Sequence, residues 1–442
     1  MLSYPVSQKL SDFAKIFTKQ GRKVYLVGGA VRDFLLGEPN DDYDFCTDAR
    51  PEDVISMFRR TYPTGIKHGT VTVRFNGECY EVTTFRTDGS YIDHRHPQDV
   101  SFTEDIAQDL CRRDFTINAF AADLGTGAII DLFNGCEDLR QGVVRCIGEP
   151  QKRFEEDALR LMRAIRFASK LGFIIEDETW KALCLKHSDL AFVAKERIRE
   201  ELMKIINGPR PEMGIRLMHE SGLLSIVLPE LEACESIAPC KHHSRPLLEH
   251  QLAALDFASS QNYCQAVRLA ALLHDIGKPE AAVVRNDSET YYGHEIISER
   301  MTRALMNRLR FSNDEIDLTC HLVANHMFHY EASWTDAAVR RFVNKVGLDC
   351  LELLFQLRRC DRYAIDGSLD ESDIIELGRR IREIQSPSLL IKDLAVNGRD
   401  MMGLGLKGQD IGRVLSALLE KVIESPELNE KKTLLDLARS LL

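Results

Sequence analysis

The segment that most constrains this chain is Leu26–Thr47, which reads LVGGAVRDFLLGEPNDDYDFCT. It predicts a short apolar strand over Val24–Val27, a Gly28-Gly29 turn, and a helix over Ala30–Leu36. The first turn of a helix leaves backbone N–H groups unpaired, and glycine lets the backbone approach an anion closely. The segment therefore predicts a strand–turn–helix unit that can bind phosphate groups.

Two acidic residues, Asp42 and Asp44, follow this helix one residue apart. On an extended segment such side chains point to the same face, so two carboxylates can hold a divalent metal. Most isolated D-x-D patterns are solvated loop acids, but the glycine turn close by favours a Mg²⁺-dependent nucleotide site. Glu81 on a later predicted strand either completes a carboxylate trio or is an ordinary acid of an edge strand.

Composition limits the class of protein. With 442 residues, several domains are expected. No apolar run approaches about 18 residues, and no secretory signal is evident, so a cytoplasmic protein without a membrane span is expected. The 12 cysteines show no C-x-x-C pair, which favours reduced thiols. The net charge of −11 means that a nucleic acid would have to bind a local basic surface.

The N-terminal part mixes helix and strand patterns. Apolar spacing predicts an amphipathic helix within residues 1–20, and Pro51–Arg60 is expected to form another helix. Alternation over residues 70–75 and 80–85, with Asn76-Gly77 between them, predicts a β-hairpin. The polar segment Asp88–Thr103 has no period and is expected to be a loop.

A second charged motif, Arg112-Arg113-Asp114, precedes a run that is predicted to be helical. An ordinary cluster of charges at a helix N-terminus would explain it. Beside a nucleotide site, Arg113 would suit a phosphate and Asp114 a ribose hydroxyl.

The segment Glu156–Arg166 is predicted to be one continuous helix, in which Asp157, Arg160 and Arg163 share a face. Such spacing usually marks a surface ion pair. The same donors and acceptors could instead read the edge of a nucleobase. Residues 152–210 carry 13 Lys and Arg against 10 Asp and Glu, so a basic surface is expected to begin here. The charges of Glu196–Glu201 are expected only to stabilise a helix.

A third region carries histidines and aspartates in apolar helical surroundings. A single histidine of this kind is usually a core or surface residue, but several around a His-Asp dipeptide favour a site for Mn, Fe, Ni, Zn or Mg. Lys278, close by, could contact a phosphate. The candidate ligands are His250, His274, Asp275, His294, His326 and Asp361.

Five motifs occur in one order: Leu26–Thr47, PTGIKHGTV, YEVTTFR, RRDFTINA and EEDALRLMRAIRFA. This order resembles the bacterial class II CCA-adding enzymes, tRNA nucleotidyltransferases of the polymerase β superfamily, over about residues 20–235. His250–Asp361 resembles an HD phosphohydrolase domain, and Leu394–Leu404 resembles the ends of these enzymes.

The resemblance implies template-independent addition of CCA to the 3′ end of tRNA from CTP and ATP. Asp42 and Asp44 match the catalytic acids that hold two Mg²⁺ ions, and Asp157 and Arg160 match the protein-side template. The Asp88–Thr103 segment matches the flexible loop needed for the final A addition. The remaining matched residues are implied to bind the nucleotide: Gly28, Gly29, Arg32, Asp33, Arg113, Asp114, Asn118, Arg163 and Arg166.

The expected fold is α+β, with a nucleotidyltransferase head of mixed sheet and helices followed by helical neck, body and HD regions. The expected domains are residues 1–145, 146–239, 240–366 and 367–442, the last contacting tRNA. A poly(A) polymerase, a CC-adding or A-adding specialist, an HD phosphohydrolase with an RNA-binding head, and a non-catalytic RNA-binding protein remain alternatives. The HD region is expected to bind Ni²⁺, Mn²⁺ or Mg²⁺ and leaves room for a second hydrolase activity. The sequence does not indicate the oligomeric state.

Overall fold

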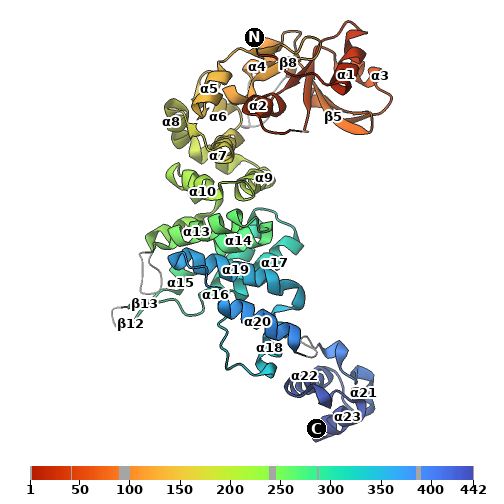
Figure 1. The fold of residues 1–442 in the computed structure, drawn as a ribbon, viewed down its shortest axis with the longest axis vertical. Helices are drawn as coiled ribbons and strands as arrows, with labels where there is room; N and C mark the ends of the chain where they lie inside the picture. Colours follow the sequence, from red (N-terminus) through yellow and green to blue (C-terminus); the bar gives the residue numbers. More distant parts are fainter. Residues whose placement is uncertain are drawn as a thin grey trace. The chain divides into compact units, whose positions relative to one another are not determined.

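The computed structural model describes residues 2–40, 42–88, 100–237, 245–285, 288–384 and 390–441. The chain forms two compact units, Met1–Glu232 and Ala233–Leu442. Figure 1 shows the main sheet in the red and orange N-terminal part and helices through most of the green and blue remainder. This agrees with the expected α+β class. The finer division into four domains stays a prediction.

The head of the first unit is built on a seven-stranded sheet in the order β3-β4-β5-β2-β1-β8-β9. Strands β2 and β5 pair in parallel and their neighbours pair antiparallel, so the sheet is mixed as predicted. The strands are β1 (Val24–Val27), β2 (Asp44–Thr47), β3 (Thr61–Gly65), β4 (Thr70–Phe75), β5 (Glu78–Thr84), β8 (Phe120–Asp123) and β9 (Ile129–Asp131).

The predicted strand–turn–helix unit is present. β1 enters Gly28, whose φ of 69° places it in the left-handed region that glycine tolerates. Helix α2 (Gly29–Leu36) follows and ends at Gly37, with φ 74°. Helices α1 (Gln8–Thr18) and α3 (Pro51–Met57) also form where the sequence predicts helices, and Asn76 and Gly77, at φ 49° and 91°, make the hairpin turn between β4 and β5.

The prediction of a helical run after Arg112-Arg113-Asp114 is wrong. Helix α4 (Ile106–Cys111) precedes the motif, and a single 3₁₀ turn, Thr116–Asn118, leads into β8. β8 lies between β1 and β9, and Phe120, Ala121 and Ala122 are fully buried. A short apolar run that is buried on both faces carries no alternation, so its period cannot distinguish strand from helix.

The predicted loop Asp88–Thr103 is described only at its ends. Strands β6 (Arg86–Asp88) and β7 (Val100–Phe102) pair antiparallel. Residues 89–99 lie outside the described residues, so the expectation of a flexible loop there is not tested.

The prediction of a continuous helix over Glu156–Arg166 is wrong, because the helix is interrupted at Asp157. Helix α6 (Pro150–Glu156) ends there, and α7 (Leu159–Leu171) begins two residues later. Asp157 is extended, with φ −145°, and its carboxylate accepts the N–H of Leu159 at 3.1 Å. Side chain–backbone bonds of this kind compete with the helical ladder. The other helices are α5 (Gly135–Gln141), α8 (Asp177–Lys186), α9 (Lys195–Ile206), α10 (Pro211–Glu220), α11 (Leu224–Val227) and α12 (Pro229–Glu232).

The second unit is helical apart from a short pair of strands, β12 (Val283–Arg285) and β13 (Ser288–Thr290). One apolar core joins helices α13, α14 and α17 to α20, and another joins the last three helices. No helix in the described ranges is long and apolar enough to cross a membrane. The helices are α13 (Leu247–Ser260), α14 (Gln265–Leu273), α15 (Lys278–Ala281), α16 (His294–Arg308), α17 (Asn313–Asn325), α18 (Asp336–Val346), α19 (Leu348–Asp366), α20 (Ser372–Glu383), α21 (Gly398–Gly403), α22 (Gln409–Glu424) and α23 (Lys431–Ser440).

Candidate functional site

A cavity of about 1360 Å³ in the first unit is lined by the head and neck residues that the sequence resemblance assigns to catalysis and nucleotide binding. The cavity therefore brings together residues that lie more than 130 positions apart in the chain. They are Gly28, Gly29, Arg32, Asp33, Asp42, Asp44, Arg113, Asp114, Asn118, Asp157, Arg160, Arg163 and Arg166.

Two carboxylates of the acid pair, Asp42 and Asp44, line this cavity, and Glu81 lies beside Asp44 in the sheet. Asp44 begins β2 and is in direct register with Glu81 on the parallel strand β5, so both side chains lie on the same face of the sheet. The loss of hydrating water raises the pKa of Asp44 to about 6, and the nearby charges of Asp42 and Glu81 add to this rise. Crowded oxygen ligands whose charges repel one another suit a hard divalent cation such as Mg²⁺.

A hydrogen-bonded chain holds Asp42 in place. The Asp33 carboxylate accepts a bond from the Asn40 amide at 2.6 Å, and the Asn40 carbonyl accepts the backbone N–H of Asp42 at 2.7 Å. Arg32 is buried and donates to Asp33 at 2.8 Å and to Asn118 at 2.6 Å. Arg32 and Asp33 thus have a positioning role that the sequence did not reveal, and Asn40 is a residue that the sequence reasoning missed.

The glycine turn faces Arg113. A Cβ atom on Gly28 would lie 3.2 Å from a terminal nitrogen of Arg113. Arg112 and Arg113 both pair with the fully buried carboxylate of Asp109, at 2.7 and 3.4 Å. Asp109 therefore orients the Arg113 guanidinium beside the N-terminus of α2. Together these groups offer a phosphate both backbone N–H donors and positive charge.

Asp114 is buried and pairs with Arg163 of α7 at 2.6 Å. Burial alone would raise the pKa of Asp114, but Arg163 and Arg160 outweigh it and lower that pKa to about 2. The same carboxylate accepts the N–H of Phe115 at 2.8 Å and the Asn118 amide at 3.3 Å. Asp114 thus links the head to α7 in addition to lining the cavity.

Asp157 and Arg160 both have protein partners. Two terminal nitrogens of Arg197, on α9, donate to the two carboxylate oxygens of Asp157 at 3.3 and 2.9 Å. The Arg160 guanidinium donates to the Glu156 carboxylate at 2.5 Å and to the Arg112 carbonyl at 2.9 Å. Arg160 has five N–H donors, so these contacts can hold the guanidinium in place while it also contacts a base.

Further residues of the cavity wall were not singled out from the sequence. The Phe167 ring lies under the guanidinium groups of Arg166, Arg32 and Arg163, at 4.0, 5.3 and 5.4 Å from its centre. Such cation–π contacts stabilise the positively charged guanidinium groups next to the ring. A Phe or a charged residue within an amphipathic helix gives no sequence signal for this role. The basic residues of the wall that the sequence did not single out are His68, Arg86, Lys170, Arg197 and Lys204.

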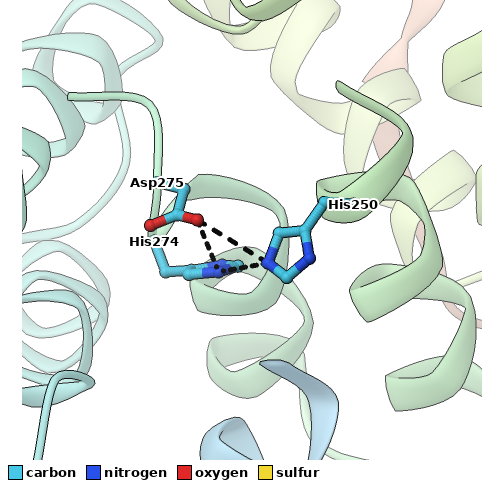
Figure 2. Close-up of side chains that lie close together, drawn as sticks. All are labelled: His250, His274 and Asp275. Carbon is cyan, nitrogen blue, oxygen red and sulfur yellow. Dashed lines mark hydrogen bonds and ion pairs between the residues drawn. The ribbon is translucent and has the colours of Figure 1, made fainter. Parts of the chain in front are cut away.

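The second unit contains the predicted histidine–aspartate cluster. All six predicted ligands are buried, and they come from five helices or helix ends. His250 Nε2 lies 3.1 Å from His274 Nε2 and 3.2 Å from an Asp361 oxygen. Figure 2 shows His250, His274 and Asp275 directed toward one another. Lys278 Nζ contacts Asp275 at 2.5 Å.

Hydrogen bonds at the far side of three rings define which nitrogen faces the cluster. The Nδ1 atoms of His274, His294 and His326 lie 2.9, 2.8 and 2.7 Å from backbone carbonyl oxygens. A carbonyl only accepts, so each Nδ1 carries a proton, and each ring in its neutral form would present the lone pair of Nε2 to the centre. His294 Nε2 lies 3.3 Å from His326 Nε2, so acceptors face acceptors unless positive charge lies between them.

The cluster divides into two groups that share Asp275. His250, His274 and Asp275 form one group of three, and Asp275, His294 and His326 form the other, with ligand atoms within 4.8 Å of one another. Burial alone would lower the pKa of His274, but Asp275 and Asp361 outweigh it and raise that pKa to about 10. The carboxylates of Asp275 and Asp361 therefore favour a positive charge beside them, which a proton or a divalent cation can supply. The nitrogen and oxygen ligands fit a transition metal.

Comparison with protein families matches three parts of the chain. Residues 24–145 match the "Poly A polymerase head domain" and residues 172–235 match the "Probable RNA and SrmB-binding site of polymerase A". Residues 294–438 match tRNA nucleotidyltransferase domain 2. The first match contains the glycine turn and the acid pair.

Two relatives illustrate how far the similarity extends. The CCA-adding enzyme of Enterococcus faecalis is 32% identical over 426 residues, which cover 95% of this chain and 92% of that protein. The CCA-adding enzyme of Lactobacillus helveticus is 48% identical over 219 residues, which cover 50% of this chain and 53% of that enzyme. The higher identity therefore spans only about half the length of that relative.

The whole chain also resembles a solved structure. The crystal structure of the Bacillus stearothermophilus CCA-adding enzyme in complex with CTP has 31% sequence identity and a TM-score of 0.73. The likeness covers 99% of this chain and 97% of that one.

Proposed function

The chain belongs to the CCA-adding enzymes, and we propose that it adds C, C and A to the 3′ end of tRNA from CTP and ATP without a nucleic-acid template. The observation that carries the proposal is the single cavity that gathers the glycine turn, the acid pair, the arginine cluster and Asp157. A poly(A) polymerase and the CC-adding and A-adding specialists predict different products in the assay below.

The carboxylates of Asp42 and Asp44 would hold Mg²⁺, with Glu81 beside Asp44 as a third candidate ligand. When bound, Mg²⁺ would lower the pKa of the tRNA 3′-hydroxyl and neutralise charge on the triphosphate. The protein contributes the arrangement: Asn40 and Asp33 hold Asp42, and the register of β2 with β5 places Asp44. Catalysis of phosphoryl transfer rests mainly on such positioning and charge compensation.

The triphosphate would lie between the Gly28-Gly29 turn and Arg113. The first backbone N–H groups of α2 and the guanidinium that Asp109 orients supply donors to phosphate oxygens. Asp114 and Asn118, at the end of the same wall, are the proposed contacts of the ribose. Arg163 and Arg166 add positive charge on the side of α7.

The base would be chosen by Asp157 and Arg160. The amino groups of cytosine and adenine are donors, whereas uracil and guanine present oxygen acceptors at the corresponding positions. A carboxylate accepts from an amino group and repels an oxygen, so Asp157 favours CTP and ATP. Arg160→Ala is expected to lower the rate and relax this choice. Unchanged discrimination against UTP and GTP would contradict a template role for Arg160.

The tRNA would be recognised by shape and backbone charge along the helical part of the first unit, with a further contact from residues 367–442. Binding should therefore weaken as salt rises. The proposed location is the cytoplasm, where tRNA substrates occur.

The test is to incubate tRNA lacking one, two or three terminal residues with each NTP alone and in pairs. The proposal predicts C on the two shorter ends and A only after CC. Asp42→Ala should abolish nucleotide incorporation while leaving tRNA binding intact. Asp189 lies outside the cavity, so Asp189→Asn should retain nucleotide incorporation. Repeated A addition, or a single type of nucleotide on every end, would instead identify a poly(A) polymerase or a specialist.

A second activity is proposed for the histidine–aspartate cluster, namely metal-dependent hydrolysis of a phosphate ester such as a 2′,3′-cyclic phosphate. The observation that favours it is the set of buried Nε2 lone pairs and carboxylates that converge on one point beside Lys278. Ni²⁺, Mn²⁺ and Mg²⁺ are the candidate metals, and the two groups that share Asp275 predict two metal positions.

Phosphate release from a 2′,3′-cyclic nucleotide with each metal tests this second activity. Metal content of the purified protein provides an independent readout. His326→Ala should lower the metal content and the release, whereas His329→Ala, an exposed histidine three residues later, should leave both unchanged. No release with any of the three metals would end the proposal of this activity without affecting CCA addition.

A further inference from the structure

Arg358 lies beside one ligand of the histidine–aspartate cluster in the second unit. Arg358 and Asp361 are three residues apart on α19, so they share a face of that helix. A terminal nitrogen of Arg358 donates to Oδ2 of Asp361 at 2.7 Å, and Oδ1 of the same carboxylate lies 3.2 Å from His250 Nε2. One carboxylate group therefore separates the guanidinium from the centre of the cluster.

The contact with Asp361 uses only part of what this guanidinium offers. An arginine has five N–H donors and keeps its positive charge. The Nε atom of Arg358 is buried, and it has no hydrogen-bond partner within the part of the chain that the structure describes. The ring of Phe328 lies 6.0 Å from the guanidinium carbon and covers it without accepting an N–H bond in the plane of the group. A buried donor without a partner is a group that a bound anion or water would satisfy.

The same arginine marks a side of the cluster that is close to solvent. The Arg358 side chain is 17% exposed, whereas none of the side chains of the six predicted ligands is more than 7% exposed. Met327, which lies between the ligand His326 and Phe328, is 58% exposed. A substrate that reaches the cluster from this side would therefore meet Arg358 before it meets the ligands.

The sign of the charge also distinguishes two roles for this arginine. A cation beside the Asp361 carboxylate repels a metal ion bound to that carboxylate, so support of the metal alone does not explain it. A phosphate bound to the metal would place negative oxygens next to the same cation. The interaction then becomes favourable, because hydrogen bonds between a guanidinium and phosphate oxygens are among the strongest in proteins.

We propose that Arg358 binds a phosphate oxygen of the ester that the histidine–aspartate cluster hydrolyses. The inference rests on the second activity proposed above and names a contact of its substrate. Without the ester, Arg358 pairs with Asp361 alone. With the ester bound, it bridges this carboxylate and the phosphate. Inorganic phosphate, a product of such hydrolysis, is the simplest probe of the contact.

The test measures binding of inorganic phosphate by isothermal titration calorimetry to the full chain loaded with Mn²⁺. Arg358→Gln should weaken this binding at least about 10-fold, as expected for the loss of one hydrogen bond between charged groups. Arg358→Lys, which keeps the charge, should recover part of the affinity. Arg359→Gln changes the neighbouring arginine, which pairs with Glu352 and Glu371, and should leave the affinity unchanged.

Metal content separates a phosphate contact from simple support of Asp361. If Arg358 binds phosphate, Arg358→Gln should keep the metal content of the unmodified protein. Unchanged phosphate affinity in Arg358→Gln, or a loss that disappears when the metal is saturated, would overturn the inference. If Arg358→Gln does not fold, Arg358→Lys gives the same comparison.

The unmodified chain distinguishes this inference from the proposed activity. No binding of inorganic phosphate by the metal-loaded chain would overturn the role of Arg358. Binding that depends on Arg358, without hydrolysis of a 2′,3′-cyclic nucleotide, would instead refute the proposed second activity and support the phosphate contact.

Discussion

Replacement of Asp44 by asparagine should stabilise the first unit while abolishing nucleotide addition. Asp44 lies beside Asp42 and Glu81, and its pKa is raised from 3.8 to about 6, first by loss of hydration and then by these charges. The folded state thus disfavours the charge that metal binding requires. Asparagine keeps the shape of the side chain and removes that charge.

The size of the effect follows from the pKa. A rise from 3.8 to about 6 would correspond to about 3 kcal/mol for a carboxylate fully shielded from water. The side chain of Asp44 is exposed on the cavity side, and solvent screening reduces the expected gain to about 1 kcal/mol. Loss of a metal ligand should lower kcat/KM at least about 1000-fold, which is about 4 kcal/mol in the barrier.

The sign depends on pH. Because the folded pKa lies above the unfolded one, the folded state binds the proton more tightly. Below about pH 4 Asp44 is protonated in both states, so Asp44→Asn should have no effect on stability. Between about pH 4 and pH 6 the penalty of the charge grows in the unmodified protein. The full gain of the variant should therefore appear only above about pH 6.

The assay is urea unfolding followed by tryptophan fluorescence. The chain has two tryptophans, Trp180 in the first unit and Trp334 in the second, so a Trp334→Phe background reports on the first unit alone. Asp189→Asn serves as the control. Mg²⁺ should stabilise the unmodified protein and have little effect on Asp44→Asn. An equal stability change at pH 4 and pH 8, or none at either, would refute the proposed origin of the raised pKa.

Three further predictions concern other parts of the chain. Asp114→Asn should destabilise the first unit by about 2 kcal/mol, because it removes a buried carboxylate charge that accepts from the half-buried Arg163. Since the pKa of Asp114 is lowered to about 2, the stability that it contributes should be present above about pH 4 and lost as the pH falls toward 2, as urea unfolding can measure. Gly77→Ala should cost about 1 kcal/mol, because φ is 91° at that turn, without a change in CTP incorporation. Chelation of metal should lower the thermal unfolding temperature of the second unit, which Trp334 reports in a Trp180→Phe background. If the purified protein contains metal and its unfolding temperature does not change on chelation, metal binding by the cluster is contradicted.

Much of the fold could be predicted because local and global preferences agree. Strand β1, helix α1 and the Asn76-Gly77 hairpin each carry a clear period or turn signal, and each is confirmed. The residues of the candidate site could be found because they occur in short motifs. Their arrangement around one cavity is now visible, although their individual roles stay proposals.

The remainder depends on contacts between distant segments. β8 is buried on both sides by its neighbours, so its short apolar run gave no usable period. The break at Asp157 depends on a side chain–backbone bond within an otherwise helical sequence. Arg197 lies 40 residues from Asp157, and nothing in its helix signals the partner. Asn40, two residues before Asp42, is the one missed residue whose turn-forming chemistry could have indicated a role.

The most direct test of the central claim is a single-turnover assay on tRNA that lacks its terminal CCA, with CTP, ATP and Mg²⁺ present. The unmodified chain should extend this tRNA by three residues and then stop, and Asp42→Ala should bind the same tRNA and extend it by none. Extension by Asp42→Ala, or an unmodified chain that binds tRNA and adds nothing, would contradict the assignment of this cavity as the site of CCA addition.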